Sequence, residues 1–459
     1  MAHQEDPGEV VRDLAEVTTE SGALSGAPGT AVPRRAVPLW RRLLSPRVAG
    51  PWAILLALGP GLIAANAGND AGGIATYATT GAQYGYSLLW VLPIITISLA
   101  VVQEMAARMG AVTGKGLSDL IRENLPLHMT ALVMLALFIS NGATVISEFV
   151  GIAASTSLIH PSAQYIAVPL TGLAIWLLVV RGSYSTVERV FLTMTLAFFA
   201  YPVSAILAHP NWGAALHNLE VPTFKMNYGY LVTIIALIGT TITPYMQVYV
   251  QSSVAEKGVT PRDYLPEKVG VYSGSVFAVA IAGFIVVATA ATLFPHPAAI
   301  TALDAAKALG PLAGQYAGLL FGIGLFGASV LAAAVLPLAT AYSISEALGV
   351  EKGVDAGFGE APVFMGIFTG LMAIGVLVAL FVSQQVMIEV LILVQVINGL
   401  LLPVVLFTIL RLVNDRRLMG EMVNGPIYNT IARITVVVVT IVSLTYLFAT
   451  ILQPFGINF

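Results

Sequence analysis

A carboxylate and two amides interrupt a long apolar stretch near the start of the chain. The segment from Gly59 to Tyr86 is apolar and long enough to cross a bilayer. Its middle carries Asn66, Asn69 and Asp70, just before a pair of glycines. An aspartate at bilayer depth is unfavourable, so such a segment persists only where it faces protein, water or a bound ion. We therefore predict a broken membrane helix with Asp70 at the break.

A second apolar stretch is interrupted by a proline. Pro244 lies inside the segment from Gly239 to Ser253. Proline cannot donate a backbone hydrogen bond and clashes with the preceding turn, so it breaks or kinks a helix. Nearby threonines and glutamines can satisfy the backbone groups that are freed. Two interrupted spans at corresponding positions of two halves point to a transporter's binding site at the bilayer midplane.

The side chains near the two breaks are almost all oxygen donors. Asp70 can bind a cation, and it can also cap the second half of its helix, because aspartate is a favoured N-cap. We favour the ligand, because carboxylates inside a membrane are usually functional. Met246 is the exception to the oxygen set, and we interpret it as a core residue that fills a gap. The further donors are Asn66, Asn69, Thr240, Thr241, Thr243, Gln247 and Gln251.

Hard oxygen donors of this kind restrict the choice of metal. Amide, hydroxyl and carboxylate oxygens suit Mg²⁺, Ca²⁺ or Mn²⁺ rather than copper or zinc. The residues that follow Asp70, from Ala71 to Gly73, are small and leave room for a cation that keeps several waters. Mg²⁺ tends to bind in that way.

The composition places these breaks in a membrane protein. Hydrophobic residues make up 57% of the 459 residues and charged residues only 10%, and the mean hydropathy is +0.86. An average soluble domain is about 25% charged, so we predict an all-α polytopic membrane protein. The chain has no cysteine, which excludes disulfides, thiolate metal sites and cysteine nucleophiles.

Residues 1–48 differ in kind from the rest of the chain. They begin with an acidic, polar stretch and end in a cluster of arginines, without the apolar core of a secretory signal peptide. We predict a mostly disordered cytoplasmic tail whose arginines lie near the anionic inner leaflet. Residues 49–454 form the predicted transmembrane domain.

Eleven spans are predicted in this domain, each near or beyond the about 20 residues that a bilayer requires. The breaks fall in the first and the sixth span, which suggests two five-span repeats and one extra helix. Because five is odd, the second repeat is inverted relative to the first. The spans are 52–81, 86–110, 128–158, 163–181, 189–208, 229–254, 268–294, 312–347, 361–383, 386–411 and 429–452, with repeat one at about 52–208, repeat two at about 229–411 and the extra helix at about 429–452.

The basic residues indicate the orientation of these spans. With the amino terminus in the cytoplasm, most lysines and arginines of the transmembrane domain fall in inner connections, whereas the outer loops hold only Lys225 and Lys307. This asymmetry follows the positive-inside rule. An odd number of spans then places the carboxyl terminus outside the cell.

The order of the motifs resembles that of the Nramp family of divalent metal transporters. The sequence has GPG and then NDAGG in the first span, GTTITPYMQ in the sixth and VINGLLLP in the tenth. In that family the first span carries an Asp-Pro-Gly-Asn motif and the sixth an Ala-x-x-Met-Pro-His motif, both unwound at the metal site. The resemblance covers nearly the whole chain from Pro51. It implies the leucine-transporter-type fold of two inverted repeats with helices one and six unwound.

The resemblance also implies a set of metal ligands. Asp70 stands where the family's metal-binding aspartate stands, and Gly73 takes the place of the asparagine. In the sixth span Thr240 takes the alanine position, Thr243 the methionine position and Tyr245 the histidine position. A hydroxyl therefore replaces the soft thioether that selects transition metals. This pattern resembles the Nramp-related magnesium transporters, which move Mg²⁺ and Mn²⁺.

Two amides in the tenth span are further candidates. Gln395 resembles a tenth-span glutamine that helps to hold the metal in one state, and Asn398 lies one helical turn further on. As amides in a packed helix they can instead join neighbouring helices, and both interpretations stay open. The residues that we assign to contacts with the hydrated ion or around its ligands are Asn66, Asn69, Tyr245, Met246, Gln247 and Asn398.

The proton route of the family is altered in this sequence. The segment ATVISEFVG resembles the family's third-span Ala-Thr-Asp-x-x-Glu pattern, with Val145 replacing the aspartate and Glu148 retaining the glutamate. Tyr245 replaces a second titratable residue, the sixth-span histidine. Our hypothesis is that transport is not coupled to protons. Glu148 is then either a residual carboxylate that faces a polar cavity or a satisfied buried acid.

We predict a secondary-type carrier that takes up Mg²⁺, and also Mn²⁺, across the cell membrane by alternating access. One alternative is a proton-coupled Mn²⁺ or Fe²⁺ transporter, which Met246 favours. Another is a sodium-coupled amino acid symporter, against which the uncompensated charge of Asp70 argues. The absence of GxSxG, P-loop and HExxH motifs argues against an enzyme. We expect the metal ion and the lipid bilayer as partners, no nucleic acid, no cofactor, and a monomer.

Overall fold

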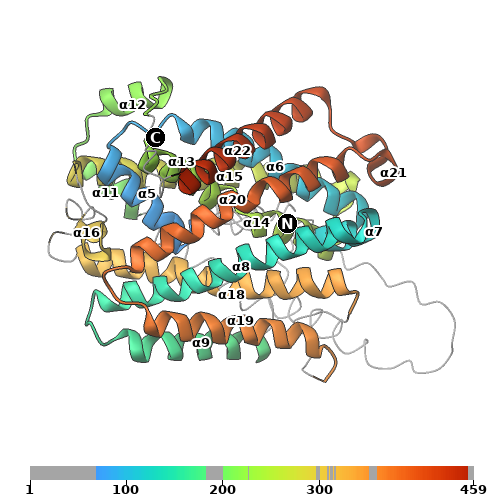
Figure 1. Ribbon diagram of the computed structural model, residues 1–459, viewed down its shortest axis with the longest axis horizontal. Helices are drawn as coiled ribbons and strands as arrows, with labels where there is room; N and C mark the ends of the chain where they lie inside the picture. Colours follow the sequence, from blue (N-terminus) through green and yellow to red (C-terminus); the bar gives the residue numbers. More distant parts are fainter. Residues whose placement is uncertain are drawn as a thin grey trace, which may run out of the picture. The chain divides into compact units, whose positions relative to one another are not determined.

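The computed structural model describes residues 69–181, 200–225, 227–295, 300–307, 310, 314, 317–350 and 359–452. Within these ranges all regular secondary structure is helical and no strand forms (Figure 1). The helices in chain order are α5 (Ala71–Tyr84), α6 (Val91–Thr113), α7 (Leu117–Asn124), α8 (Leu127–Ser157), α9 (Gln164–Arg181), α11 (Ala200–Leu207), α12 (Trp212–Glu220), α13 (Tyr228–Thr241), α14 (Pro244–Glu256), η3 (Pro261–Asp263), α15 (Leu265–Leu293), α16 (Ala302–Lys307), α18 (Ala317–Leu348), α19 (Pro362–Phe381), α20 (Met387–Val413), α21 (Arg416–Met419), η5 (Gly420–Met422) and α22 (Pro426–Leu452).

Among the described residues, eight helical segments are long and apolar enough to cross a membrane. They agree with the second, the third and the sixth to eleventh predicted spans, and α9 agrees with the fourth. The described residues therefore confirm the prediction of an all-helical membrane protein. Most of the first and fifth predicted spans, like the predicted tail at 1–48, lies outside the described residues, so the count of eleven remains a prediction. The eight are Val91–Thr113, Leu127–Ser157, Tyr228–Ala255, Leu265–Leu293, Phe321–Leu348, Pro362–Phe381, Met387–Val413 and Pro426–Leu452.

The predicted break in the sixth span is present between α13 and α14. α13 ends at Thr241, and the backbone is non-helical at Ile242 (φ −112°, ψ 57°) and extended at Thr243 (φ −65°, ψ 139°). α14 then begins at Pro244. Proline suits a first helical position, because the N–H that it lacks has no partner there. The proline therefore starts a new helix rather than kinking an existing one.

A helix also begins where the sequence predicts the first break. α5 starts at Ala71, and Asp70 is its N-cap. The preceding half of the predicted first span lies outside the described residues. α5 is buried along nearly its whole length, so the charged residue at its start lies inside the protein.

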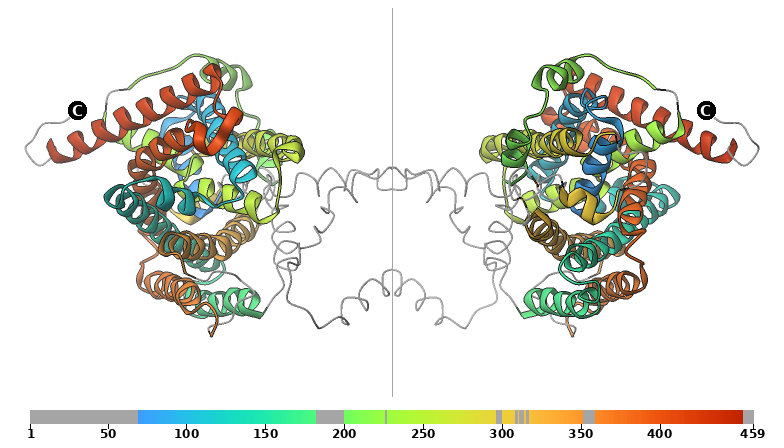
Figure 2. Two further views of the ribbon diagram at one scale, coloured as in Figure 1. Left: turned by 90° about the vertical axis from the view of Figure 1, so that its right-hand side faces the viewer. Right: turned by 90° about the vertical axis from the view of Figure 1, so that its left-hand side faces the viewer.

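The helices pack in two groups that meet along α20. In one group α8 packs on α18 and α19, and α9 packs on α8 and α19, so that Figure 1 shows these four helices side by side. In the other group α15 packs on α5 and α6, and α14 packs on α6. α20 contacts α8 from the first group and α5 and α13 from the second. α22 lies at the edge of the helices in both views of Figure 2. Only 22% of the residues in its most apolar stretch are buried.

Two glycines let α13 and α20 cross at close range. A Cβ atom on Gly239 would lie 2.0 Å from the carbonyl oxygen of Gln395 and 2.4 Å from the backbone nitrogen of Gly399. A Cβ atom on Gly399 would lie 2.7 Å from the carbonyl oxygen of Ile235. The obstructing atoms are backbone atoms, which cannot rotate away. This crossing sets the distance between the broken helix and Gln395.

We predict that Gly239→Ala destabilises the protein, because the added methyl group must push α13 and α20 apart. Overpacking of this kind typically costs about 1–3 kcal/mol. Gly366→Ala is the matched control, since Gly366 lies in α19 and a Cβ atom there would meet no atom within 4 Å. The control receives the same gain in helix propensity, about 1 kcal/mol. Thermal unfolding in lipid nanodiscs should show a lower Tm for Gly239→Ala only; equal values for both variants would contradict the close crossing.

Candidate metal site

Asp70 uses one carboxylate oxygen to cap α5 and keeps the other without a partner. Oδ1 accepts a hydrogen bond from the backbone N–H of Gly73 at 2.6 Å. The same oxygen accepts from Nε2 of Gln395 at 3.3 Å. Asp70 is 1% exposed, and its Oδ2 has no hydrogen-bond partner among the described residues. The capping role and the ligand role that the sequence suggests are therefore compatible in one side chain.

A second carboxylate meets the same helix end from α8. Oε2 of Glu148 accepts from the backbone N–H of Ala71 at 3.2 Å, and Oε1 accepts from the hydroxyl of Ser147 at 3.3 Å. Both acids thus receive N–H groups from the first turn of α5, where the helix dipole favours negative charge. Of the two interpretations of Glu148, this geometry corresponds to a buried acid whose two oxygens both accept hydrogen bonds.

A chain of amides and hydroxyls fixes the orientation of the Gln395 side chain. Oε1 of Gln395 accepts from Nδ2 of Asn398 at 3.0 Å, while its Nε2 donates to Asp70. Nδ2 of Asn398 also donates to the Thr144 hydroxyl at 3.0 Å, and its Oδ1 accepts from the Ser140 hydroxyl at 2.6 Å. Because each amide end has a partner, the NH₂ group of Gln395 points at Asp70. We call this chain, from Ser140 and Thr144 through Asn398 and Gln395 to Asp70, the amide relay.

The end of the relay on α8 is the part of the site that sequence reasoning missed. Ser140 and Thr144 were not identified as site residues. They lie four residues apart on α8, and Glu148 follows four residues later. That spacing places all three on neighbouring turns of one helix face. It is the signal from which their shared role could have been found, although it does not reveal their partner on α20.

Gln395 also connects the start of α5 with the break between α13 and α14. Its side chain fills the space beside Gly72, where a Cβ atom would lie 1.8 Å from Nε2, and its carbonyl oxygen lies against Gly239, one residue before Thr240. A hydrogen bond of 2.8 Å between the hydroxyls of Tyr77 and Thr241 joins α5 to α13 directly. The structure therefore brings the start of α5, the end of α13 and the middle of α20 into contact around Gln395.

Several oxygens at the second break are buried without partners. The hydroxyls of Thr240 and Thr243 and the Oε1 atom of Gln247 have no hydrogen-bond partner within the described part of the chain, and all three residues are 0% exposed. An unpaired buried polar atom costs roughly 1–3 kcal/mol. Native proteins keep few of them, and each calls for an explanation such as a bound ion. Together with Oδ2 of Asp70, these atoms are candidate cation ligands.

The remaining predicted residues occupy different surroundings. Asn69 donates from Nδ2 to the carbonyl oxygen of Ala278 at 3.2 Å, and its Oδ1 has no partner among the described residues. Tyr245 and Met246 are each 1% exposed and belong to the main hydrophobic cluster. Asn66 lies outside the described residues. Of the three that the structure describes, Asn69 is the one that shows an oxygen without a partner.

The acidic and other titratable side chains of the described residues limit what this site can bind. No group of three or more His, Cys, Asp or Glu side chains that could hold a metal occurs in the described ranges. A site on Asp70 therefore draws on neutral oxygens, which hydrated hard cations accept as ligands.

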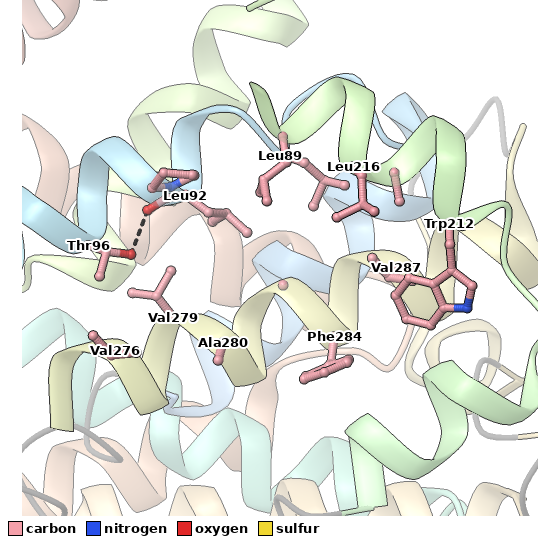
Figure 3. Close-up of a pocket in the computed structure, with 14 residues that line it drawn as sticks. Leu89, Leu92, Thr96, Trp212, Leu216, Val276, Val279, Ala280, Phe284 and Val287 are labelled. Atoms are coloured by element: carbon pink, nitrogen blue, oxygen red, sulfur yellow. Dashed lines mark hydrogen bonds between the residues drawn. The ribbon is translucent and has the colours of Figure 1, made fainter. Parts of the chain in front are cut away.

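A separate cavity of about 310 Å³ between α6, α12 and α15 is lined almost wholly by apolar side chains such as Leu92, Trp212 and Phe284 (Figure 3). Its lining includes the hydroxyl of Thr96, which already donates to the carbonyl oxygen of Leu92 at 2.8 Å.

Comparisons with known proteins place the sequence in a family. Residues 61–449 match the family described as natural resistance-associated macrophage protein-like. The chain is 31% identical to a divalent metal cation transporter, MntH, of Burkholderia ambifaria over 338 residues, covering 70% of this chain and 76% of that protein. It is 28% identical to the MntH of Aeromonas hydrophila over 401 residues, covering 84% of this chain and 93% of that protein.

A solved structure shares the fold. The crystal structure of a manganese transporter of Eremococcus coleocola, in complex with an aromatic bis-isothiourea compound, superposes with a TM-score of 0.74. Each chain is covered to 90%, at 19% sequence identity. At this level of sequence identity, the similarity shows that the two proteins share the arrangement of their helices.

We predict that Gly72→Ala weakens binding of Mn²⁺, because the new methyl group must displace the Gln395 side chain from Asp70. Loss of a residue that orients a ligand typically lowers metal affinity by about 10–100-fold. Gly142→Ala on α8 is the control, since its Cβ atom would meet only Leu371 at 3.8 Å, an ordinary contact. Titration of the purified proteins with Mn²⁺ measures both. Wild-type affinity in Gly72→Ala would mean that Gln395 does not orient Asp70.

Proposed function

The chain belongs to the natural resistance-associated macrophage protein-like family, and from this we propose that it carries divalent metal ions across the cell membrane by alternating access. It is a transporter rather than an enzyme, as its curated relatives are by name. The observation that carries the proposal is Oδ2 of Asp70, a buried carboxylate oxygen without a partner among the described residues. A buried charge requires compensation, and a cation supplies it.

The ion is held by oxygens from both breaks. Asp70 supplies the charge, Thr240 and Thr243 supply hydroxyls from the second break, and Gln395 orients Asp70 and lies within reach of the same point. Gly73 donates its N–H to Asp70 and leaves space beside it. Further residues contact these ligands or the waters that the ion keeps. We assign this role to Asn66, Asn69, Tyr245, Met246, Gln247 and Asn398.

The preferred ions in this proposal are Mg²⁺ and Mn²⁺. The structurally similar protein of Eremococcus coleocola is described as a manganese transporter, which supports Mn²⁺. Mg²⁺ is proposed because Thr243 offers an oxygen where the family has a thioether, and because hard, hydrated cations prefer such ligands. The alternative, a proton-coupled Mn²⁺ or Fe²⁺ carrier, requires a soft ligand, and Met246 is the residue that would supply it.

Transport is proposed to proceed without protons. Both oxygens of Glu148 accept hydrogen bonds, one of them from the first turn of α5, which supports a role in holding that helix end. The membrane potential favours inward movement by about 2.3 kcal/mol per elementary charge per 100 mV. A divalent ion therefore gains roughly twice that value, which is sufficient to drive uptake.

The full architecture is also part of the proposal. We place eleven spans in two inverted five-helix repeats of the leucine-transporter type plus an extra helix, α22. The amino terminus is cytoplasmic and the carboxyl terminus extracellular, and the protein is a monomer in the plasma membrane. The breaks at Asp70 and between α13 and α14 support the repeats, because they fall in the first span of each half.

We predict that proteoliposomes containing the wild-type protein take up both Mn²⁺ and Mg²⁺, and that Asp70→Asn lowers this uptake to the background of empty vesicles. The substitution keeps the size of the side chain and removes the charge that balances the ion. Glu389→Gln is the control, since it removes an exposed carboxylate from α20. Uptake of both ions by Asp70→Asn would refute the assignment of Asp70 as the central ligand.

We predict that metal uptake causes no acidification of the vesicle interior, because no proton accompanies the ion. A pH-sensitive dye inside the vesicles measures this during uptake of Mn²⁺. Glu148→Gln keeps the size of the side chain and one acceptor oxygen for the N–H of Ala71 and removes the titratable group, so uptake by this variant should show the same dependence on external pH as the wild type. Acidification in step with Mn²⁺ uptake that disappears in Glu148→Gln would establish the proton-coupled alternative.

A further inference from the structure

The cavity between α6, α12 and α15 has a buried wall and an exposed rim, and we call it the α15 groove. Leu92 and Val279 in its wall are 4% and 5% exposed, whereas Val276 and Leu216 at its rim are 57% and 56% exposed. No charged side chain occurs among the described residues that line it. The cavity is therefore an apolar groove that opens at the surface of the protein.

The open side of the α15 groove faces the bilayer. Both α6 and α15 are long and apolar enough to cross a membrane, and the chain belongs to a family of membrane transporters. Val276 lies near the middle of α15, which runs from Leu265 to Leu293, and hence at the depth of the hydrocarbon core. The exposed side chain of Val276 therefore contacts lipid rather than water.

The α15 groove is about as long as one leaflet is deep. Its lining on α15 extends from Val276 to Val287 along one helix face. With a rise of about 1.5 Å per residue, this stretch is about 16 Å long. The hydrocarbon core of a bilayer is about 30 Å thick, so the groove covers roughly half of it. Most of the groove lies in the half of α15 that is nearer Leu293.

α12 covers one end of the α15 groove and marks the membrane surface there. Trp212, Leu216 and Leu219 follow helical spacing and all line the groove, while the polar side chains of α12 lie outside this stripe. Figure 3 shows Trp212 at the Val287 end of the groove and Val276 at the other end. A short amphipathic helix with a tryptophan suits the interface between headgroups and acyl chains.

A different face of α15 holds the helix of the metal site. The carbonyl oxygen of Ala278 accepts from Nδ2 of Asn69 at 3.2 Å. Gly81 of α5 lies against Val286, because a Cβ atom on Gly81 would be 2.3 Å from the Val286 carbonyl oxygen. Ala278 and Val286 do not line the groove, although their neighbours Val279 and Val287 do. The α15 groove is therefore separate from the candidate metal site.

We propose that the α15 groove binds one acyl chain of a membrane phospholipid, with the headgroup at the level of α12. The walls are apolar, the open side faces the bilayer, and the length corresponds to one leaflet. A long acyl chain is the ligand that a bilayer supplies with these properties. The volume of about 310 Å³ lies within the range of about 300–1,000 Å³ that is common for ligand pockets. The inference goes beyond the proposed function, because it requires that α6 and α15 span the membrane and does not depend on the transported ion.

The test labels the full-length protein in lipid nanodiscs with a phosphatidylcholine that carries a photoactivated diazirine in one acyl chain. Mass spectrometry should find the label concentrated on α12 and on the stretch of α15 from Val276 to Val287. Ala280→Trp should abolish the label there, because the exposed Ala280 lines the groove and the larger side chain fills it. Ala373→Trp is the control and should leave the label unchanged, since it adds the same side chain to an exposed alanine of α19.

A milder variant protects the test against misfolding. A Cβ atom on Gly283 would lie 3.5 Å from Cδ1 of Leu92, an ordinary contact, so Gly283→Val narrows the groove without a clash. It should lower the label by less than Ala280→Trp does, at an unchanged Tm.

Two results would overturn the acyl-chain site. One is label spread evenly over lipid-facing helices such as α19 and α22, which would mean that only annular lipid is present. The other is label on α15 that persists undiminished in both Ala280→Trp and Gly283→Val. If the label behaves as proposed while the wild type takes up no metal ion, the proposed function fails and the α15 groove stands as a lipid site.

Discussion

The carboxylate of Asp70 at the start of α5 is the interaction on which the surrounding structure depends. Its two oxygens have different tasks, because Oδ1 accepts from Gly73 and Gln395 while Oδ2 has no partner among the described residues. A helix that begins inside a membrane protein must satisfy its first N–H groups there. Asp70 and Glu148 do so from two sides. The same arrangement concentrates negative charge where a cation can approach.

The hydrogen bonds around Asp70 join the two groups of helices, directly through Glu148 and Ala71 and indirectly through α20. Glu148, Ser140 and Thr144 belong to α8, which packs with α9, α18 and α19, whereas Asp70 and the break at Thr243 belong to the group around α15. Movement of one group against the other must break the contact of Glu148 with Ala71 or the relay through Gln395. A hydrogen bond to a charged group contributes roughly 1.5–3 kcal/mol. A bound ion that competes for Asp70 therefore changes the relative free energy of the positions that the two groups of helices can take.

The elements that could be predicted from the sequence are those with a strong local signal. Pro244 fixes the start of α14 because its ring excludes the preceding helical turn, and Asp70 with its two glycines marks the start of α5. The spans followed from long apolar runs. The α8 members of the amide relay were not predicted, because their role depends on Ser140 meeting Asn398 across a sequence separation of 258 residues. The spacing on α8 suggests a shared face, but only the packed structure identifies the partner.

The nature of the atoms around the bound ion decides between the proposed carrier and its alternative. X-ray absorption spectroscopy of Mn²⁺ bound to the full-length wild-type protein reports the elements in the first coordination shell. The account predicts a shell of oxygen atoms alone, with an unchanged spectrum in Met246→Leu. A sulfur atom in that shell, lost in Met246→Leu, would contradict an oxygen-only site on Asp70 and would establish a soft ligand for transition metals.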